Sequence, residues 1–336
     1  FASQRVWRSE NRGDNWKAIS KDLTKNQERL ALPIMGKVQS FENAWDVYAM
    51  STYNTITSLA ESKADENILY AGTDDGIIQL TKDGGKSWEK MTVDQLPKVP
   101  STAFVNDIKA DLYDKQTAYI ALDNHKFGDY QPYLYKTIDG GKKWTSISDG
   151  IPDGTLVWRI VQDHINPNLL FLGTEYGVYV SLNKGEKWHK FSNGLPTIPV
   201  RDLAIQKREN DLVLATFGRS FYVLDDYSPL REINEESIGK EAILFAPKKA
   251  LQYNRINGGT RSSGGATFNA KNPPYGAIFT YYLKEGHTSK RAKRQKAEIS
   301  EKVDPTLLEK LNKAGYKTTN KILEEDIDVL AKKTKI

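Results

Sequence analysis

The sequence contains no cysteine. Disulfides, thiolate metal sites and thiol nucleophiles are therefore excluded, whereas the compartment stays undecided, because a secreted protein can do without disulfides. No apolar run approaches the roughly 20 residues that a membrane-spanning helix needs, so we expect no transmembrane segment. The four histidines are scattered and form no His-Glu-x-x-His pattern. We expect neither a bound metal nor a cofactor.

Most of the chain also lacks net charge. The net charge of +5 is carried by residues 284–336, which contain 14 basic and 9 acidic residues, whereas residues 1–283 are neutral overall. Nucleic-acid binding by the main domain would need a concentrated basic face, so we expect no nucleic-acid partner. The basic stretch favours a solvated tail; attachment to an anionic envelope surface is the weaker alternative.

What the sequence has in abundance is a repeated motif. It reads hydroxyl, any residue, Asp or Asn, any residue, Gly, two residues, Trp, and it occurs four times. We expect the Asp or Asn to accept turn amides, the Gly to adopt a positive φ and the Trp to pack its indole between neighbouring units. The residues in these structural roles are Asn11, Gly13, Trp16, Asp83, Gly85, Trp88, Asp139, Gly141, Trp144, Asn183, Gly185 and Trp188.

Each motif closes a unit of about 45 residues. A unit holds an apolar run, a β-rich run ending in Gly-Thr, a tight turn, an alternating strand, the motif, and a strand that opens on the Trp. Short runs of period two between turn signals are antiparallel strands. Four strands per unit predict the blades of a β-propeller. The final copy, residues 200–226, keeps three strands and lacks the motif.

The motif is similar to the Asp-box (BNR) signature, and the units resemble blades of sialidase-like, sortilin-like and xyloglucanase-like propellers. Residues 195–226 and 272–284 also resemble stretches of large bacterial Asp-box proteins, of Bacteroidetes type, that are known as sortilin-like or glycosyl hydrolase proteins. The resemblance covers about residues 1–284. It implies a secreted or cell-envelope protein. Phe217 departs from it, because such proteins commonly have His there.

We therefore predict an all-β fold: a partial β-propeller of four-stranded Asp-box blades, a short β-sandwich-like segment and a polar helical tail. The first repeat lacks its inner strand, so we expect the chain to be the C-terminal part of a larger propeller with its remaining blades upstream of Phe1. The predicted divisions are a propeller over 1–233 (partial blade 1–20, blades about 21–91, 92–147, 148–191 and 192–233), a β-sandwich-like module over 234–283, and a basic, partly helical or disordered tail over 284–336.

The preferred functional hypothesis is a binding propeller that presents loops to a protein, peptide or glycan. The insertion at 123–133 is rich in aromatic residues, which suits a loop that stacks on a ligand. Candidate ligand-binding residues are Trp45, His125, Phe127, Tyr130, Trp158, Arg159, Arg201 and Arg219.

The alternative is a sialidase-like or xyloglucanase-like glycoside hydrolase. The motif acids do not suit this role, because each is bound into its own hairpin, whereas glycosidases need two carboxyls about 5 to 10 Å apart. Asp74, Asp75 and Glu175 lie in turns that lead toward the central channel and are the candidate catalytic residues. The sequence alone does not show whether Arg159, Arg201 and Arg219 converge on a substrate carboxylate.

Overall fold

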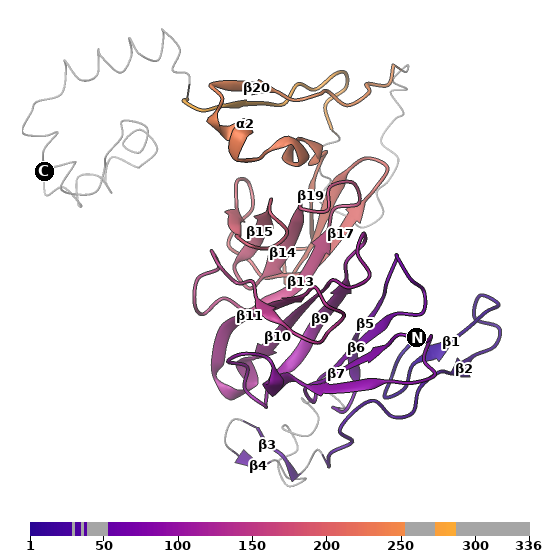
Figure 1. Ribbon diagram of the computed structural model, residues 1–336. Helices are drawn as coiled ribbons and strands as arrows, with labels where there is room; N and C mark the ends of the chain where they lie inside the picture. The colour runs from indigo at the N-terminus through magenta and orange to yellow at the C-terminus, as the bar shows by residue number, and fades with distance from the viewer. Residues whose placement is uncertain (29–30, 35–36, 39–52, 253–272, 287–336) are drawn as a thin grey trace, which may run out of the picture. The chain divides into compact units, whose positions relative to one another are not determined.

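The computed structural model describes residues 1–28, 31–34, 37–38, 53–252 and 273–286, and these are nearly all β (Figure 1). Three four-stranded antiparallel sheets follow one another along the chain, preceded by two two-stranded sheets and followed by a three-stranded sheet. We call the two-stranded sheet within residues 7–18 the first sheet, and the three four-stranded sheets and the three-stranded sheet blades 1 to 4. The arrangement is the predicted partial β-propeller, and the final blade has three strands, as its sequence indicates.

The elements have the following bounds. The first sheet pairs β1 (Trp7–Arg8) with β2 (Lys17–Ala18). Blade 1 comprises β5 (Ile56–Glu61), β6 (Leu69–Thr73), β7 (Ile77–Thr81) and β8 (Glu89–Thr92). Blade 2 comprises β9 (Phe104–Ala110), β10 (Ala118–Asn124), β11 (Asp129–Thr137) and β12 (Thr145–Ser146). Blade 3 comprises β13 (Val157–Gln162), β14 (Leu170–Thr174), β15 (Gly177–Ser181) and β16 (His189–Phe191). Blade 4 comprises β17 (Val200–Gln206), β18 (Asp211–Thr216) and β19 (Phe221–Leu224). The remaining elements are β3 (Pro33–Ile34), β4 (Lys37–Val38), β20 (Ala242–Leu244), β21 (Tyr281–Leu283), the 3-10 turns η2 (Val93–Gln95), η3 (His125–Phe127) and η4 (Ser228–Glu232), and helix α2 (Glu235–Gly239).

The blades pack face to face, with their first strands side by side. Strands pair in chain order within a blade, and the first strands β5, β9, β13 and β17 each contact the first strand of the neighbouring blade. The third strands were expected to alternate, and this expectation holds for β19, whose residues are alternately exposed and half-buried, but is wrong for β7 and β15. Every residue of β7 and β15 is buried, because blades cover both faces of these strands.

Cross-strand pairs at fixed positions fill the seams between blades. In blade 3, Phe171 lies opposite Val180, and both belong to the hydrophobic cluster shared with blade 4. The corresponding pair in blade 4 is Val213 with Val223. Val223 is 53% exposed and its neighbour Phe221 is 69% exposed. Blade 4 thus shows to solvent the kind of face that the other blades bury.

The repeated motif forms the predicted hairpin turn between third and fourth strands. In blade 1, the Gly85 N–H donates to Thr81 Oγ1 over 2.9 Å, and the Ser87 N–H donates to Asp83 Oδ1 over 2.9 Å. Gly85 has a φ of 93°. Asn183 accepts the equivalent amide in blade 3, so the turn does not need a charge. Hydrogen bonds from Ser87 hold the pKa of Asp83 well below its usual range. Asp83 and Asn183 therefore accept backbone amides within their own turns.

The motif tryptophans pack on the preceding sheet in three of the four copies. Trp144 and Trp188 are buried and Trp88 is half-buried, whereas Trp16 of the first sheet is 51% exposed. The indole N–H donates to a backbone carbonyl in two copies, from Trp88 to Ile19 over 3.2 Å and from Trp188 to Ile147 over 2.8 Å. The indole N–H of Trp144 is buried and has no partner among the described residues.

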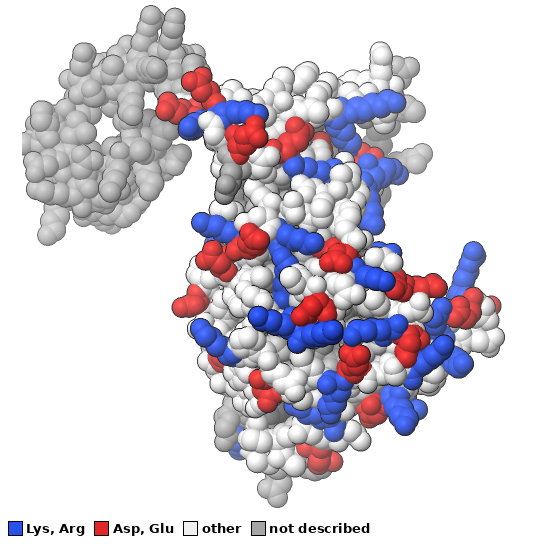
Figure 2. Space-filling model, viewed as in Figure 1, with Lys and Arg blue, Asp and Glu red and all other residues white. Residues whose placement is uncertain are grey.

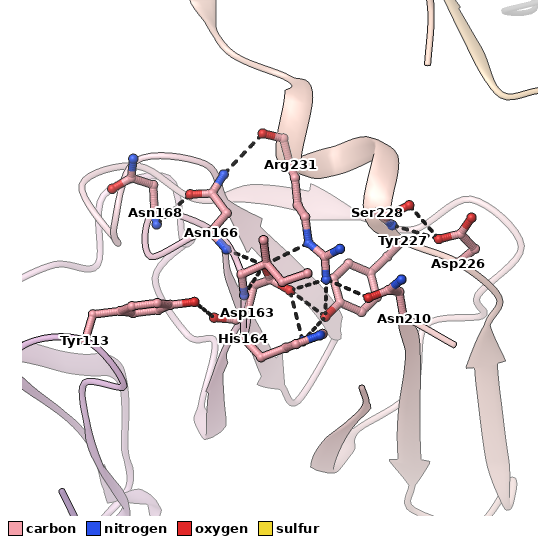
Figure 3. A network of polar contacts seen from close by, with 11 residues as sticks. Tyr113, Asp163, His164, Asn166, Asn168, Asn210, Asp226, Tyr227, Ser228 and Arg231 are labelled. Carbon is pink, nitrogen blue, oxygen red and sulfur yellow. Dashed lines mark hydrogen bonds and ion pairs between the residues drawn. The ribbon is translucent and has the colours of Figure 1, made fainter. Parts of the chain in front are cut away.

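The turn η4, after blade 4, is fastened to blade 3 through Asp163 (Figure 3). The buried carboxylate of Asp163 accepts hydrogen bonds from Arg231 Nε over 2.9 Å, from Arg231 Nη2 over 2.8 Å and from the Tyr227 hydroxyl over 2.6 Å. Backbone N–H groups of Ile165 and Asn166 donate to it as well. Burial by itself would raise the pKa of Asp163, but these hydrogen bonds lower it to about 2. Asp163 is therefore an ion that ties two blades together.

A second unit, described by itself, contains the two-stranded sheet of β20 and β21, in which Ile243 lies opposite Tyr282. Residues 253–272 of the predicted β-sandwich-like segment and 287–336 of the predicted tail lie outside the described residues, as does Trp45. No helix of the described part is long and apolar enough to cross a bilayer.

Candidate functional site

The first strand of every blade carries a β-bulge near its start. In blade 3, Val157 pairs with Thr174 and Arg159 pairs with Gly173, so Trp158 is the extra residue. The extra residues in blades 1, 2 and 4 are Thr57, Asn106 and Arg201. A bulge bends its strand and re-aims the extra side chain. Each blade therefore has one redirected side chain at the same end of its first strand.

At this end a continuous stack of aromatic and cationic side chains crosses blades 2, 3 and 4. We call it the ladder, and its members in order are Lys126, Phe104, His125, Trp158, Arg201 and Phe217. Lys126 Nζ lies 4.8 Å from the centre of the Phe104 ring. The Phe104 and His125 rings meet edge to face at 6.1 Å, and the His125 and Trp158 rings at 6.2 Å. The Arg201 guanidinium lies 3.6 Å from the Trp158 ring centre and 5.6 Å from that of Phe217.

Five different segments supply the ladder. Phe104 opens β9, and His125 and Lys126 form the η3 turn that follows β10. Trp158 and Arg201 are the bulge residues of β13 and β17. Phe217 lies in the turn between β18 and β19, where its N–H donates to the Pro199 carbonyl. The ladder exists only because the blades are packed together.

The insertion at 123–133 is not the free loop that we expected. Its flanks continue β10 and β11, with Asn124 opposite Asp129, and only the η3 turn separates them. Tyr133 is buried and donates to the Asp129 carboxylate over 2.6 Å. Alternating β-prone residues on both sides of the turn let the hairpin lengthen instead of forming a loop. Phe127 and Tyr130 remain partly exposed at its tip, at 39% and 49%.

Two acids hold the ladder in place from behind. Asp123 is fully buried, and its carboxylate oxygens lie 2.7 and 2.6 Å from His125 Nδ1. Glu175 Oε2 accepts the Trp158 indole N–H over 2.9 Å. The same oxygen is 3.9 Å from Arg201 Nη2, which is longer than a hydrogen bond. The rings of His125 and Trp158 are therefore fixed before any ligand arrives.

Arg159, a candidate ligand contact, is engaged within the protein. Its Nη1 donates to the Asn106 carbonyl over 2.8 Å and to the buried Asp107 carboxylate over 3.3 Å. Its Nε lies 3.6 Å from Asp202 Oδ1. Asp107 also accepts the Ser58 hydroxyl over 3.2 Å. This network joins the first strands of all four blades beneath the ladder.

The candidate catalytic acids are divided between two blades, with Asp74 and Asp75 on blade 1 and Glu175 on blade 3. Asp74 Oδ1 accepts the Thr55 N–H over 2.7 Å, and Asp75 Oδ2 accepts the Lys25 N–H over 2.6 Å. Both carboxylates belong to the turn between β6 and β7 of blade 1, where burial raises the pKa of Asp74. Glu175 belongs to the turn between β14 and β15 of blade 3, with blade 2 in between. Among the described residues, no contact joins Asp74 or Asp75 to Glu175.

Three residues named from the sequence, His125, Trp158 and Arg201, are brought together in the ladder. Phe104, Lys126 and Phe217 were not named as ligand contacts. Phe104 stands two residues before the bulge residue Asn106 of blade 2, and the bulge itself leaves no signal in the sequence. Arg219 lies in the same exposed turn as Phe217.

Charge is mixed over the visible surface. Lys and Arg side chains are interspersed with Asp and Glu on the face shown in Figure 2. Within the described ranges, no group of three or more His, Asp or Glu side chains could hold a metal ion. The ladder is therefore the candidate functional site.

The sequence matches no protein-family profile and no curated protein. Several solved structures have a similar fold. An ancestral GH74 enzyme is 18% identical with a TM-score of 0.45, and the match covers 63% of this chain and 25% of that one. The GH74 enzyme of Niastella koreensis is 12% identical with a TM-score of 0.45, over 66% of this chain and 33% of that one. YCF48 bound to D1 peptide is 17% identical with a TM-score of 0.39, over 51% of each chain. This chain spans about a quarter to a third of the GH74 structures that it matches.

Proposed function

We propose that this chain is a binding β-propeller segment whose ladder contacts a protein or peptide. The observation that carries the proposal is the continuous stack of aromatic and cationic groups across three blades. Its outer members are accessible, with Phe217 68% exposed and the Arg201 side chain 43% exposed. Aromatic residues and Arg are the types that dominate binding energy at protein interfaces.

The ladder suits a peptide better than a sugar. A sugar ring would need a bare aromatic face, and the largest ring here, Trp158, is only 8% exposed with Arg201 lying on it. A peptide can instead contact the exposed ring edges, accept hydrogen bonds from the Arg201 guanidinium and place its apolar side chains against Phe217. Since Asp123 and Glu175 already fix the rings, binding loses little side-chain entropy.

Selection of peptides from a random display library tests this proposal. Bound peptides should lose affinity by about tenfold or more when Phe217→Ala or Arg201→Ala is introduced, the size expected at an interface hot spot. Ile138→Ala is the matched control, because Ile138 is also 68% exposed but lies in the motif turn of blade 2. Failure to enrich any peptide, or equal binding by all three variants, would contradict the proposal.

A glycoside hydrolase is the second candidate, and one observation favours it. Burial raises the pKa of Asp74, as a general acid requires. Sugar release from sialosides and β-glucans should then be measured for the unchanged chain and for Asp74→Asn, Asp75→Asn and Glu175→Gln. Turnover that is lost in these variants while their melting temperatures are kept would support a hydrolase. No turnover by the unchanged chain would reject it for this segment.

We also propose that the remaining blades of the parent propeller, upstream of Phe1, cover the free face of blade 4. The exposure of Phe221 and Val223, at positions whose counterparts are buried in blade 3, supports this. In a longer chain the amides of β19 should exchange with solvent more slowly than here, and unchanged exchange would refute the proposal. The likeness to Asp-box proteins further supports an extracytoplasmic location, which cell fractionation tests.

A further inference from the structure

We infer that the ladder selects acidic peptides; this inference rests on the proposed function and adds the class of ligand. It follows from how the charges at this end of the blades are already used.

The acids near the ladder are satisfied within the protein. Asp123 is paired with His125, with a shortest distance of 2.6 Å. Glu175 accepts the Trp158 indole N–H. Asp202 lies against Arg159 at 3.6 Å. Each of these three carboxylates therefore has a partner within the protein, and of the three the Asp202 side chain is the most exposed, at 67%.

The cations at the ladder, its members Lys126 and Arg201 and the neighbouring turn residue Arg219, are less closely paired. Among the described residues, neither Lys126 nor Arg219 has an acid within the 4.0 Å of an ion pair, and Lys126 acts on Asp74 only at longer range. Within the described ranges, the one acid paired with the Arg201 guanidinium is Glu175, at 3.9 Å. Its face is covered by Trp158, which leaves the edge donors of the guanidinium for a ligand.

Cationic groups therefore alternate with aromatic surface along one line. Lys126 lies over Phe104 at one end. At the other end the Arg201 guanidinium lies 5.6 Å from the centre of the Phe217 ring, and Arg219 belongs to the same exposed turn as Phe217. Carboxylates of a peptide can accept charge-assisted hydrogen bonds from these groups, while its apolar or aromatic side chains cover Phe217. An acidic sugar polymer would also supply carboxylates, but its C–H face offers Phe217, which is 68% exposed, less apolar surface than an aromatic peptide side chain does.

The test uses the full chain and a fluorescein-labelled random copolymer of Glu and Tyr as the probe, followed by fluorescence anisotropy. Binding should occur at low salt and weaken as salt screens the charges. The double variant Lys126→Ala/Arg201→Gln should weaken it by about tenfold or more. The matched control is Lys142→Ala/Lys143→Ala, which removes two exposed cations from the motif turn of blade 2 and should change affinity less than about twofold.

Two comparison probes separate the other outcomes. A copolymer of Lys and Tyr should not bind, and polygalacturonate should compete poorly. Equal binding of the Lys copolymer, equal competition by polygalacturonate, or an unaffected double variant would each overturn the inference. If the library selection yields neutral or basic peptides whose binding depends on Phe217, the proposed function stands and the inference about acidic peptides fails.

Discussion

The tryptophans of the repeated motif share one position but differ in one hydrogen bond. Trp188 donates its indole N–H to the Ile147 carbonyl, whereas the buried Trp144 indole N–H has no partner in the part of the chain that the structure describes. Replacing Trp188 by Phe leaves a carbonyl without its donor, which typically costs about 1 to 3 kcal/mol. Replacing Trp144 by Phe removes no such bond.

Trp188→Phe should therefore lower the free energy of unfolding more than Trp144→Phe, by roughly 1 kcal/mol or more. Urea denaturation of the two variants beside the unchanged chain measures the difference. Since both substitutions remove the same atoms from buried rings, each serves as the control for the other. Equal losses would show that the indole N–H groups have equivalent partners in solution.

Local chemistry explains why the motif residues were predictable. Asp83 and Asn183 accept amides only four residues away, and the positive φ of Gly85 follows from the same turn. The ladder was only partly predictable, because stacking of Arg201 on Trp158 joins two blades and depends on their packing. Residue type predicted that His125, Trp158 and Arg201 contact a ligand, whereas their contacts with one another depend on the tertiary structure.

Strands approach one another closely where a blade carries glycine. A Cβ atom added to Gly72 in β6 would lie 2.3 Å from Val105 Cγ1 of blade 2, well inside van der Waals contact. Gly72→Ala should therefore destabilise the protein by about 1 to 3 kcal/mol, the usual cost of overpacking. Thermal unfolding measures it. Gly239→Ala is the control, since no atom lies within 4 Å of its added Cβ.

The attachment of η4 to blade 3 should depend on pH. The folded pKa of Asp163 is lowered to about 2, below its unfolded value of about 4. A lowered pKa stabilises the fold above the unfolded value, and this contribution of roughly 2 kcal/mol is lost as pH falls through 4 toward 2. Asp163→Asn should reduce stability at pH 7 and flatten the pH dependence below 4, as urea titrations would show. A parallel shift at all pH values would contradict this.

Periodicity predicted the strands of each blade but not their exposure or their irregularities. The third strand β15 reads as alternating, yet it is buried throughout, because single-sequence patterns carry no information on whether the second face is covered. The bulges at Trp158 and Arg201 were missed for a related reason. A bulge changes pairing with a neighbour and leaves the composition of its own strand unchanged.

At the scale of the whole molecule, the free face of blade 4 is an association risk. Phe221 and Val223 are exposed on a strand whose outer edge pairs with no strand among the described residues. The double variant Phe221→Lys/Val223→Lys should reduce concentration-dependent self-association in sedimentation velocity, with its fold kept by circular dichroism. Leu59→Lys, at a side chain that is 37% exposed on blade 1, is the control. Unchanged association would mean that this face is not adhesive.

The line of stacked rings and cations draws its members from three separate sheets. A ligand that contacts all of these side chains at once opposes separation of the three sheets. Ligand binding and the stability of the packing between blades therefore become coupled. By mass action, a ligand at a free concentration one hundred times its dissociation constant would stabilise the packed arrangement of blades 2, 3 and 4 by about 2.7 kcal/mol.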